Sequence, residues 1–525
     1  MTVDILLFTD NTHILFVRSA GAYAVATTLR AAGYSVQVVD HFLLLGVEKT
    51  LAIIDKFVGP NTLFVGFGTT FMNPTFRHLK ETEVNNQIFT YDGYWTTTSN
   101  RNIYIDTIAY RVPISDPEMD AIKNRITSIN SKTKLVIGGS KANDLRQSQM
   151  DVFIIGYAEQ SVVDFAKYLQ GKNPFFHYRT TQAGQMIVDH DIDAKNYNFS
   201  ESGIRFSSTD LIDSTELLPL EVARGCIFKC KFCSFRLIGK KKNDYTKTSE
   251  ALYSELMYNY DNFGVTRYTF VDDTLNESIY KLDHILGVVK KLPFKLEIAS
   301  YIRHDLIHTY PEMADMLSEI GLKAACFGIE SLNHETGKLI GKGLHPEKTK
   351  ELLTWLRNEK KWKNNILMYS GFIIGLPKDT VNTVTTWTEE ISDPSYPLDS
   401  VYLIPLMMIS DSTRLKKSEF ELNYEKYGYT YETGSTVRWK NKDWTYDSAT
   451  AFAKKYTLRN WESKRNTVTS FASAALRSYG YSWEQIFTMR EKDYNWNNIF
   501  QTNIIRTNTY YDNLIGNQNG PVSNI

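Results

Sequence analysis

Apolar and polar positions in the first part of the chain follow two alternating periods. Continuous apolar runs within DILLFTD, YSVQVVD, NTLFVGFGTT, KLVIGGS and DVFIIG are typical of strands that are buried on both faces. Between them apolar residues recur at helical spacing, as in AYAVATTLRAAG, and further helices are expected at about 47–57, 116–130 and 159–169. The alternation predicts an α/β fold that begins with a Rossmann-like, doubly wound domain over residues 1–175.

A second alternation begins near residue 217, after a polar stretch at 176–215 that is expected to be a connector. Its strand-like runs are PLEVAR, RYTFVDD, KLEIASYI, KAACFGIE, LMYSGFIIG and SVYLIPL. Helical patterns between them are found at about 248–262, 277–291, 311–319, 346–359 and 380–391. These units predict a partial (β/α)6 TIM-type barrel over residues 216–425.

The last hundred residues, from about 426 to 525, are rich in tyrosine and tryptophan and have a different pattern. Helices are expected near 447–462 and 482–491, and Ser482 and Gln485 have the spacing of a capping box at the start of the second. We therefore expect a small, mostly helical C-terminal domain. An irregular, aromatic-rich insertion at 72–112 interrupts the first domain.

Small residues follow several predicted strands of the first domain. In open parallel sheets ligands bind at the carboxyl ends of the strands, and small residues let a ligand approach the backbone there. Glycine also ends strands for conformational reasons alone, so this pattern leaves both interpretations open. The candidate residues are Thr69, Thr70, Gly138, Gly139, Ser140 and Gly156.

Composition narrows the range of partners. Lys plus Arg and Asp plus Glu each number 59, so the formal net charge is zero and no nucleic-acid or membrane-binding surface is indicated. The residues MTVDILLFTD lack the basic flank of a signal peptide, and the apolar runs are too short to span a bilayer. Four cysteines in 525 residues do not make a disulfide framework, and we expect a cytoplasmic protein.

Three of the four cysteines lie together in GCIFKCKFC, as Cys226, Cys230 and Cys233. A structural zinc site needs a fourth ligand, and no second Cys-x2-Cys pair or His-x3-His pair is nearby. A redox dithiol needs only Cys230 and Cys233, which leaves Cys226 without a role. Three thiolates suit a [4Fe–4S] cluster whose fourth iron stays open to another ligand.

The Cys-x3-Cys-x2-Cys spacing, with an aromatic residue before the third cysteine, resembles the signature of the radical SAM superfamily. The resemblance extends over about residues 1–410 and is to the branch with an N-terminal cobalamin-binding domain. It implies that Cys226, Cys230 and Cys233 bind a [4Fe–4S] cluster. In that family the open iron binds the amino and carboxylate groups of S-adenosylmethionine (SAM).

Further segments resemble the SAM-binding strands of that branch, in the same order. They are FVDDTLN, EIASYIRHDLI, FGIES and GFIIGLPKDT. FVDDTLN would supply a carboxylate to the methionine ammonium group, and EIASYIRHDLI would supply a guanidinium to the methionine carboxylate or the cluster edge. FGIES would supply a carboxylate to the ribose, and GFIIGLPKDT would form a turn along the adenine. The resemblance thus implies a SAM site made of Phe232, Asp272 or Asp273, Ser300, Arg303, Glu330 and Gly375.

The first domain resembles the cobalamin-binding domain of the same branch, and the resemblance implies that the small residues at its strand ends contact cobalamin. The Asp-x-His-x-x-Gly motif, whose histidine binds cobalt in other cobalamin proteins, is absent, and His13 and His41 stand in other contexts. Cobalamin is therefore expected without a protein imidazole on the lower face of cobalt, or else to have been lost from a degenerate domain.

The resemblance implies a radical SAM enzyme that receives electrons from an external donor such as flavodoxin or ferredoxin and acts on a small-molecule or peptide substrate. The expected reaction is cobalamin-dependent methyl transfer to an unactivated carbon, started by a 5′-deoxyadenosyl radical. The alternatives are a radical SAM cyclase, oxidoreductase or rearrangement enzyme with a degenerate cobalamin domain, and a non-catalytic iron–sulfur module. Methylthiolation is disfavoured, because no cysteine precedes Cys226 to bind a second cluster.

Overall fold

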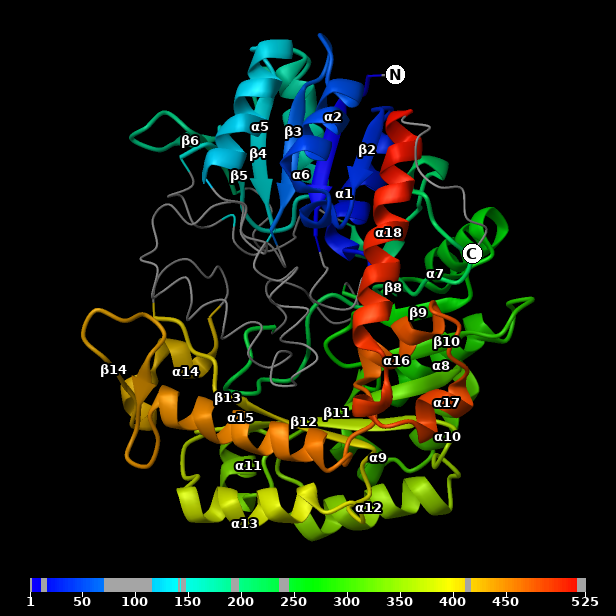
Figure 1. The fold of residues 1–525 in the computed structure, drawn as a ribbon, viewed down its shortest axis with the longest axis vertical. Coiled ribbons are helices and arrows are strands. Elements are labelled where there is room, and N and C mark those ends of the chain that lie inside the picture. The colour runs from blue at the N-terminus through cyan, green and yellow to red at the C-terminus, as the bar shows by residue number, and fades with distance from the viewer. Residues whose placement is uncertain are drawn as a thin grey trace.

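The computed structural model describes residues 2–10, 17–69, 116–139, 142, 148–189, 198–235, 245–410 and 417–516. The predicted insertion at 72–112 and the candidate residues Thr70 and Ser140 lie outside this part of the chain. The described residues form two large sheets, with the N-terminal sheet above the second one in Figure 1 and helix α18 running along both.

The first sheet has the strand order β2-β1-β3-β4-β5-β7-β6, and all neighbours are parallel except β6 and β7. Helices α1 (Ala20–Ala31) and α6 (Glu159–Leu169) cover one face, and α2 (Gly46–Phe57) and α5 (Asp116–Ile129) the other. The predicted Rossmann-like, doubly wound sheet is confirmed. Its strands are β1 (Ile5–Thr9), β2 (Val36–Val39), β3 (Phe64–Gly68), β4 (Lys134–Gly138), β5 (Val152–Ile154), β6 (Arg179–Thr180) and β7 (Met186–Val188).

Strands β6 and β7 come from the stretch that was expected to be a connector. Ile187 and Val188 are buried, and β7 pairs with β5 in parallel. The alternation in this stretch is only three residues long, which is too short to indicate a strand by its period. The first domain of the structure therefore extends beyond residue 175.

The second sheet has six parallel strands in chain order, and its edges are β8 and β13. Since these two edge strands do not pair, the barrel is open, and the predicted partial (β/α)6 barrel is confirmed. Its strands are β8 (Leu218–Leu220), β9 (Arg267–Phe270), β10 (Glu297–Ile302), β11 (Leu322–Glu330), β12 (Leu367–Ile374) and β13 (Ser400–Pro405).

Helices cover the outer face of this barrel, and each predicted helix is present. Two short ones, α9 and α11, were not predicted, because neither contains two full turns of a repeating pattern. Gly321 ends α10 at a φ of +109°, and a Cβ there would lie 2.1 Å from Leu296 O, so only glycine fits this turn into β11. The helices are α7 (Ser249–Phe263), α8 (Ile279–Val289), α9 (His304–Thr309), α10 (Met313–Ile320), α11 (His334–Ile340), α12 (Pro346–Asn358) and α13 (Val381–Ser392).

The C-terminal region does not form a core of its own. Its hairpin of β14 (Thr430–Tyr431) and β15 (Trp439–Lys440) and its helix α15 (Tyr446–Glu462) pack on the barrel. The capping box of Ser482 and Gln485 is present at α17, as predicted. The remaining helices are α14 (Glu419–Leu422), α16 (Ser470–Arg477), α17 (Trp483–Thr488) and α18 (Trp496–Ile515).

Helix α16 fills part of the inner face of the barrel, opposite the outer helices. Ala472 and Ala475 are buried there among side chains of β10, β11 and β12, including Ala299 and Tyr369. Ala299 and Tyr369 belong to the amino-terminal halves of their strands, so α16 covers that half of the inner face. No helix in the described ranges is long and apolar enough to cross a membrane.

Candidate active site

The cysteine loop follows β8, at the carboxyl end of the first barrel strand. Gly225 has a φ of +89°, which lets the chain turn immediately before Cys226. The N–H of Cys226 donates to Phe235 O (2.8 Å) and the N–H of Cys233 donates to Cys230 O (3.0 Å), so the loop closes on itself. The three cysteines are free thiols and each is half-buried.

Two distant segments hold this loop from outside. The N–H of Lys231 donates to Ile340 O at the end of α11 (3.2 Å), and the N–H of Phe420 in α14 donates to Lys231 O (3.0 Å). Gly341 lies so near that its Cβ would stand 3.7 Å from Cys230 Cα. The loop is therefore fixed by both the barrel and the C-terminal region.

Arg303, directly after β10, contacts the cysteine loop. Its Nη1 donates to Cys230 Sγ (3.6 Å), and its guanidinium carbon lies 4.0 Å from the centre of the Phe228 ring. The guanidinium also binds Asp305 and donates to Gly341 O (3.1 Å). Burial opposes the charge, but the hydrogen bond and the negative charge of Asp305 raise the pKa of Arg303. A permanent cation thus lies at the edge of the loop.

Cys226 and Cys233 are protonated thiols in the absence of iron. Burial raises the pKa of Cys226, and it raises the pKa of Cys233 to about 12, so cluster binding must release protons. Among the residues that the structure describes, no three His, Cys, Asp or Glu side chains converge on a single metal ion. The donor set fits a [4Fe–4S] cluster, in which each thiolate binds a different iron.

The two candidate aspartates of FVDDTLN have different environments. Asp272 is buried in the barrel wall, where Oδ1 accepts from the N–H of Val222 (2.7 Å) and Oδ2 pairs with Lys281 Nζ (2.7 Å). Asp273 is half-buried, and its charge contributes to the raised pKa values of Cys226 and Cys233. Of the two, Asp273 is the one whose charge acts on the cysteine loop.

The candidate residues on β10 and β11 are also placed differently. Ser300 is buried on the same face of β10 as Ile302, which packs toward the outer helices, so its side chain does not line the inner face. Glu330 has a φ of +70° where the pairing of β11 with β12 becomes irregular. A non-glycine residue with a positive φ has a higher conformational free energy, and such residues are concentrated at functional sites. Burial raises the pKa of Glu330, and Lys342 Nζ lies 3.9 Å from it.

Gly375 packs against the C-terminal hairpin, and Phe232 packs against the main hydrophobic core. A Cβ at Gly375, whose φ is +94°, would stand 2.2 Å from the Trp439 ring, and Gly375 O accepts from Tyr429 Oη (2.7 Å). Packing against the C-terminal hairpin therefore explains this glycine, and its contact with adenine stays a prediction. Phe232 is partly buried against the main hydrophobic core, next to Cys233.

Four candidate residues meet at one edge of the first sheet, because β3, β4 and β5 are neighbours. The N–H and Oγ1 of Thr69 both donate to Gly138 O (2.9 and 2.7 Å). Gly139 and Gly156 have φ values of +92° and +96°. A Cβ added at Gly138 would have no described neighbour within 4 Å. These four residues lie at the carboxyl ends of neighbouring parallel strands, where open sheets bind ligands, and the cobalamin contact stays a prediction.

Comparison with known proteins identifies the second sheet. Residues 220–389 match the family model of the radical SAM superfamily. The chain contains a radical SAM domain. A curated relative, the uncharacterized methyltransferase PH0819 of Pyrococcus horikoshii, is 28% identical over 184 residues, which are 32% of this chain and 38% of that protein. The match therefore spans well under half of the relative's length.

Two solved structures share the fold of the radical SAM domain together with the first sheet. The radical SAM methyltransferase TsrM from Kitasatospora setae, with cobalamin and a [4Fe–4S] cluster bound, is 14% identical with a TM-score of 0.58 and covers 83% of this chain and 82% of its own. The cobalamin-dependent SAM radical enzyme OxsB, with aqua-cobalamin bound, is 12% identical with a TM-score of 0.56 and covers 98% of this chain and 80% of its own.

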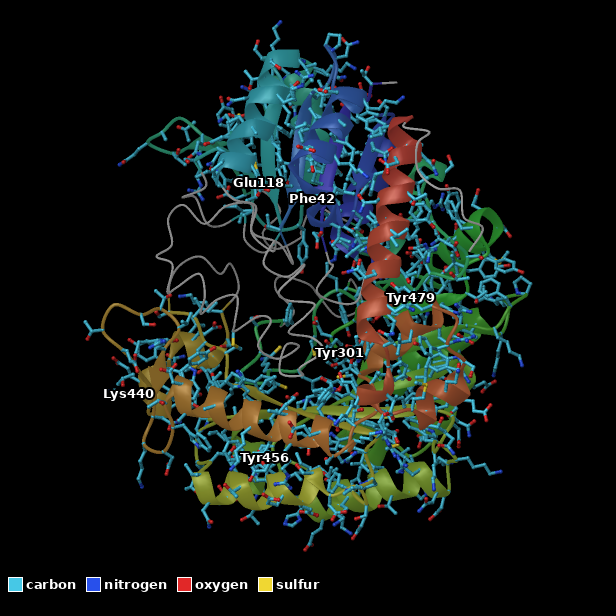
Figure 2. The ribbon with its side chains drawn as sticks, viewed as in Figure 1. Phe42, Glu118, Tyr301, Lys440, Tyr456 and Tyr479 are labelled. Carbon is cyan, nitrogen blue, oxygen red and sulfur yellow. The ribbon has the colours of Figure 1, made fainter. Side chains whose placement is uncertain are left out.

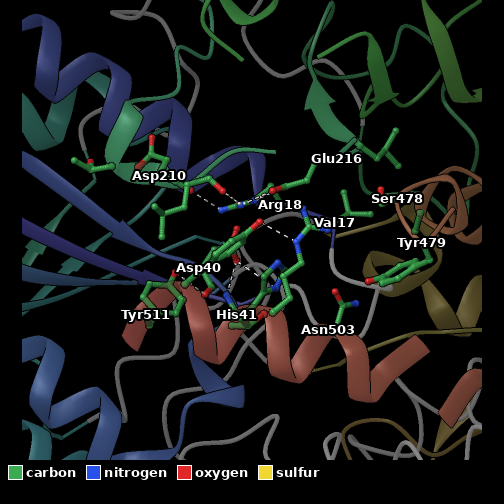
Figure 3. A pocket seen from close by; sticks show the side chains of 17 residues that line it. Val17, Arg18, Asp40, His41, Asp210, Glu216, Ser478, Tyr479, Asn503 and Tyr511 are labelled. Carbon is green, nitrogen blue, oxygen red and sulfur yellow. Dashed lines mark hydrogen bonds and ion pairs between the residues drawn. The ribbon is translucent and has the colours of Figure 1, made fainter. Parts of the chain in front are cut away.

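A small cavity of about 50 Å³ lies between the first sheet, the segment that leads into β8 and the C-terminal helices α16 and α18 (Figure 3). Arg18, Asp40, His41, Glu216 and Asn503 are among its lining residues. It has room for a few water molecules only. His41 follows the end of β2. Strand β1 lies between β2 and β3, so His41 is separated from the glycine-lined edge, which is the edge formed by Thr69, Gly138, Gly139 and Gly156.

Several residues at the radical SAM site were not predicted. Asn276, in FVDDTLN, accepts from the N–H of Arg303 through Oδ1 (2.8 Å) and donates to Arg303 O through Nδ2 (2.9 Å). Tyr301 is the one exposed residue of β10, alternates with buried Ser300 and Ile302, and lies between the two sheets in Figure 2. Arg224, two residues before Cys226, binds Glu159 of the first sheet's helix α6. Asn276, Tyr301 and Arg224 could have been predicted because they lie in or next to the sequence motifs, whereas Glu159 could not.

Proposed function

We propose that this protein is a cobalamin-dependent radical SAM methyltransferase that methylates an unactivated carbon of a small-molecule or peptide substrate. The observation that carries the proposal is the loop of Cys226, Cys230 and Cys233 at the end of β8, with Arg303 Nη1 3.6 Å from Cys230 Sγ. The family match and the fold shared with TsrM and OxsB support it.

Each proposed group has residues that fit it. The three cysteines would hold three irons and leave one open, and Arg303 would offset the negative charge of their thiolates. Asp273, whose charge acts on the cysteine loop, is the candidate carboxylate for the methionine ammonium group, and Glu330 is the candidate for the ribose. When bound, the cluster and SAM supply a 5′-deoxyadenosyl radical and cobalamin supplies the methyl group. The chain binds, orients and excludes water around these groups.

The carboxyl edge of β3, β4 and β5 is the proposed cobalamin site. Gly138, Gly139 and Gly156 are at least partly exposed at this edge among the described residues, and the buried Thr69 fixes the end of β3 on Gly138 O. His41 lies beyond β1, in the cavity beside Asp40, so it is not proposed as a cobalt ligand. Thr70 and Ser140 stay sequence-based predictions for the same site.

A second candidate is a radical SAM enzyme that performs cyclisation, rearrangement or oxidation with a degenerate first domain. The absence of an Asp-x-His-x-x-Gly motif favours it. The two candidates differ in one measurable property, since only the methyltransferase must bind cobalamin. An external electron donor and a cytoplasmic location are expected for both.

Anaerobic reconstitution tests the proposal. We expect about four irons per chain and absorbance near roughly 400 nm in the wild type, and loss of both in Cys226→Ala, Cys230→Ala and Cys233→Ala. Cys326→Ala is the matched control, because Cys326 is buried on β11 away from the loop. A Cys230→Ala variant that retains the wild-type cluster would overturn the cluster assignment.

Two further measurements test the enzyme itself. Reduction in the presence of SAM should release 5′-deoxyadenosine, and its absence would contradict radical initiation. The wild type should also retain cobalamin through anaerobic gel filtration, as seen in its absorption spectrum. Loss of cobalamin together with continued release of 5′-deoxyadenosine would favour the second candidate.

A further inference from the structure

Both ends of β8 are tied to the first sheet by arginine–glutamate pairs. Before the strand, Arg18 binds Glu216 through two contacts, Nε–Oε2 (2.7 Å) and Nη2–Oε1 (2.8 Å). After the strand, Arg224 Nη1 binds Glu159 Oε1 of α6 (2.6 Å). Strand β8 carries the cysteine loop, so the loop's position relative to the first sheet is set at both ends of this strand.

Arg224 is held on every side. Besides Glu159, it binds Glu221 through Nε (2.8 Å) and Nη2 (2.6 Å), and its guanidinium carbon lies 4.9 Å from the ring centres of Tyr157 and Phe199. Burial opposes the charge, but the two carboxylates raise the pKa of Arg224 well above its ordinary value. Apolar residues in place of these ion pairs would stabilise the interface about equally well. What the ion pairs of Arg224 add is therefore a fixed relative position of the groups that they join.

The path between the two candidate cofactor sites is short. Arg224 lies two residues before Cys226, and Glu159 lies three residues after Gly156 of the glycine-lined edge. The N–H of Arg224 also donates to Tyr245 O (2.9 Å), which fixes the backbone at this point. The ion pair therefore connects the start of the cysteine loop directly with the carboxyl end of β5.

We propose that Arg224 is a positioning residue that fixes the separation between the cysteine loop and the cobalamin edge of the first sheet. The inference rests on the proposed function, which assigns a cofactor to each side. A reaction between groups on two sheets requires that their separation vary little, since small misplacements lower the rate steeply. Lysine cannot replace Arg224, because its single ammonium group lacks the planar arrangement of N–H donors with which the guanidinium binds two carboxylates.

Hydrogen exchange of the protein without added cofactors tests the mechanical link. Glu159→Gln removes the ion pair of Arg224 with the first domain and leaves its contact with the Tyr157 ring, whereas Glu221→Gln removes the ion pair next to β8. We expect Glu159→Gln to raise exchange about tenfold or more in both 157–165 and 225–235. Glu221→Gln should affect 225–235 alone.

The matched control is Glu389→Gln, which breaks the exposed pair of Glu389 with Arg459 on the outside of the barrel. It should leave both segments unchanged. If Glu159→Gln lowers the melting temperature but leaves exchange at 225–235 as in the wild type, Arg224 is only a structural residue and the proposal is wrong.

Pulsed EPR of the reconstituted protein tests the separation itself. With the cluster reduced and cobalamin in the Co(II) state, the wild type should give one narrow distribution of distances between the two spins. Arg224→Lys and Glu159→Gln should broaden it, while each variant keeps its iron and cobalamin. An unchanged distribution contradicts the proposal. If the wild type shows no cobalamin signal, the proposed function fails, and the exchange experiment still decides whether Arg224 links the two segments.

Discussion

At the scale of single residues, Arg303 is a charged group in direct contact with the cysteine loop. It touches the sulfur of Cys230, the ring of Phe228 and the end of α11. Removing its charge should make the bound cluster harder to reduce, because a nearby cation stabilises the more negative, reduced form. A unit charge several ångströms away corresponds to a change on the order of 50–100 mV.

Spectroelectrochemistry of the reconstituted protein checks this prediction. Arg303→Met should shift the reduction potential to more negative values, and Arg303→Lys, which keeps the charge, should shift it less. The prediction fails if the two variants have equal potentials. Iron content must be compared first, because Arg303 also donates to Gly341 O and its loss could loosen the loop.

Asp379 gives a prediction on pH. Burial raises its pKa to about 7, although Thr336 and Asn333 donate to it. Since this native pKa lies above the ordinary value for aspartate, its contribution to stability is complete below about pH 4 and is lost as the pH rises to about 7. The free energy of unfolding of the wild type, measured against that of Asp379→Asn, should therefore fall by a few kcal/mol between about pH 4 and 8.

Urea denaturation of both proteins at several pH values measures this difference. Asparagine keeps the size of the side chain and cannot ionise, so it isolates the titration of Asp379. A difference between the two proteins that is the same at every pH would show that the native carboxyl titrates normally.

At the scale of secondary structure, the periods of the sequence predicted β1 to β5 of the first sheet, all six strands of the barrel and the long helices around them, but missed β6, β7, α16 and α18. Helix α16 has only eight residues, and five of them are Ser or Ala, so few large apolar side chains indicate it in the sequence. Helix α18 is rich in Asn and Thr, which have low helix propensity. Its stability comes from tertiary contacts such as Lys49 Nζ with Asp512 (2.9 Å), which no local pattern reveals.

The inner-face packing of α16 can be tested by overpacking. Ala472 is fully buried against the strands, so Ala472→Leu should lower the free energy of unfolding by about 1–3 kcal/mol. Ala451→Leu on α15 is the control, because Ala451 is exposed and leucine is tolerated there. Chemical denaturation compares the two. Equal stabilities would mean that α16 can move away from the strands at little cost.

At the scale of the whole molecule, the sequence predicted what is local and missed what is brought together by folding. The cysteine spacing identified the loop, and its neighbour Arg303 was found from its own motif. The sequence could not show that Ser300 points to the outer helices or that Gly375 packs against Trp439, because both depend on strand facing and on a hairpin some sixty residues away. The pair of Arg224 with Glu159 is non-local in the same way.

Helix α18 links the two halves of the molecule. Its first residue, Trp496, is buried in the cluster on the inner face of the barrel, and Tyr511, near its other end, is buried in the core of the first sheet. Tyr511 Oη accepts from the N–H of Asp40 (2.8 Å) and donates to Asp40 O (3.0 Å). The helix therefore crosses from one core to the other and ends on the backbone that follows β2.

Tyr511→Phe should weaken this link. It leaves two buried backbone groups of Asp40 without their partner, which costs about 1–3 kcal/mol. We expect a lower melting temperature and faster proteolysis within α18, whereas Tyr510→Phe, which removes only the contact of Arg506 with Tyr510 Oη, should change both much less. If the two variants behave alike, α18 is held by apolar packing alone. If Tyr511→Phe also loosens the cysteine loop in hydrogen exchange, the two halves move as one unit through α18 as well as through β8.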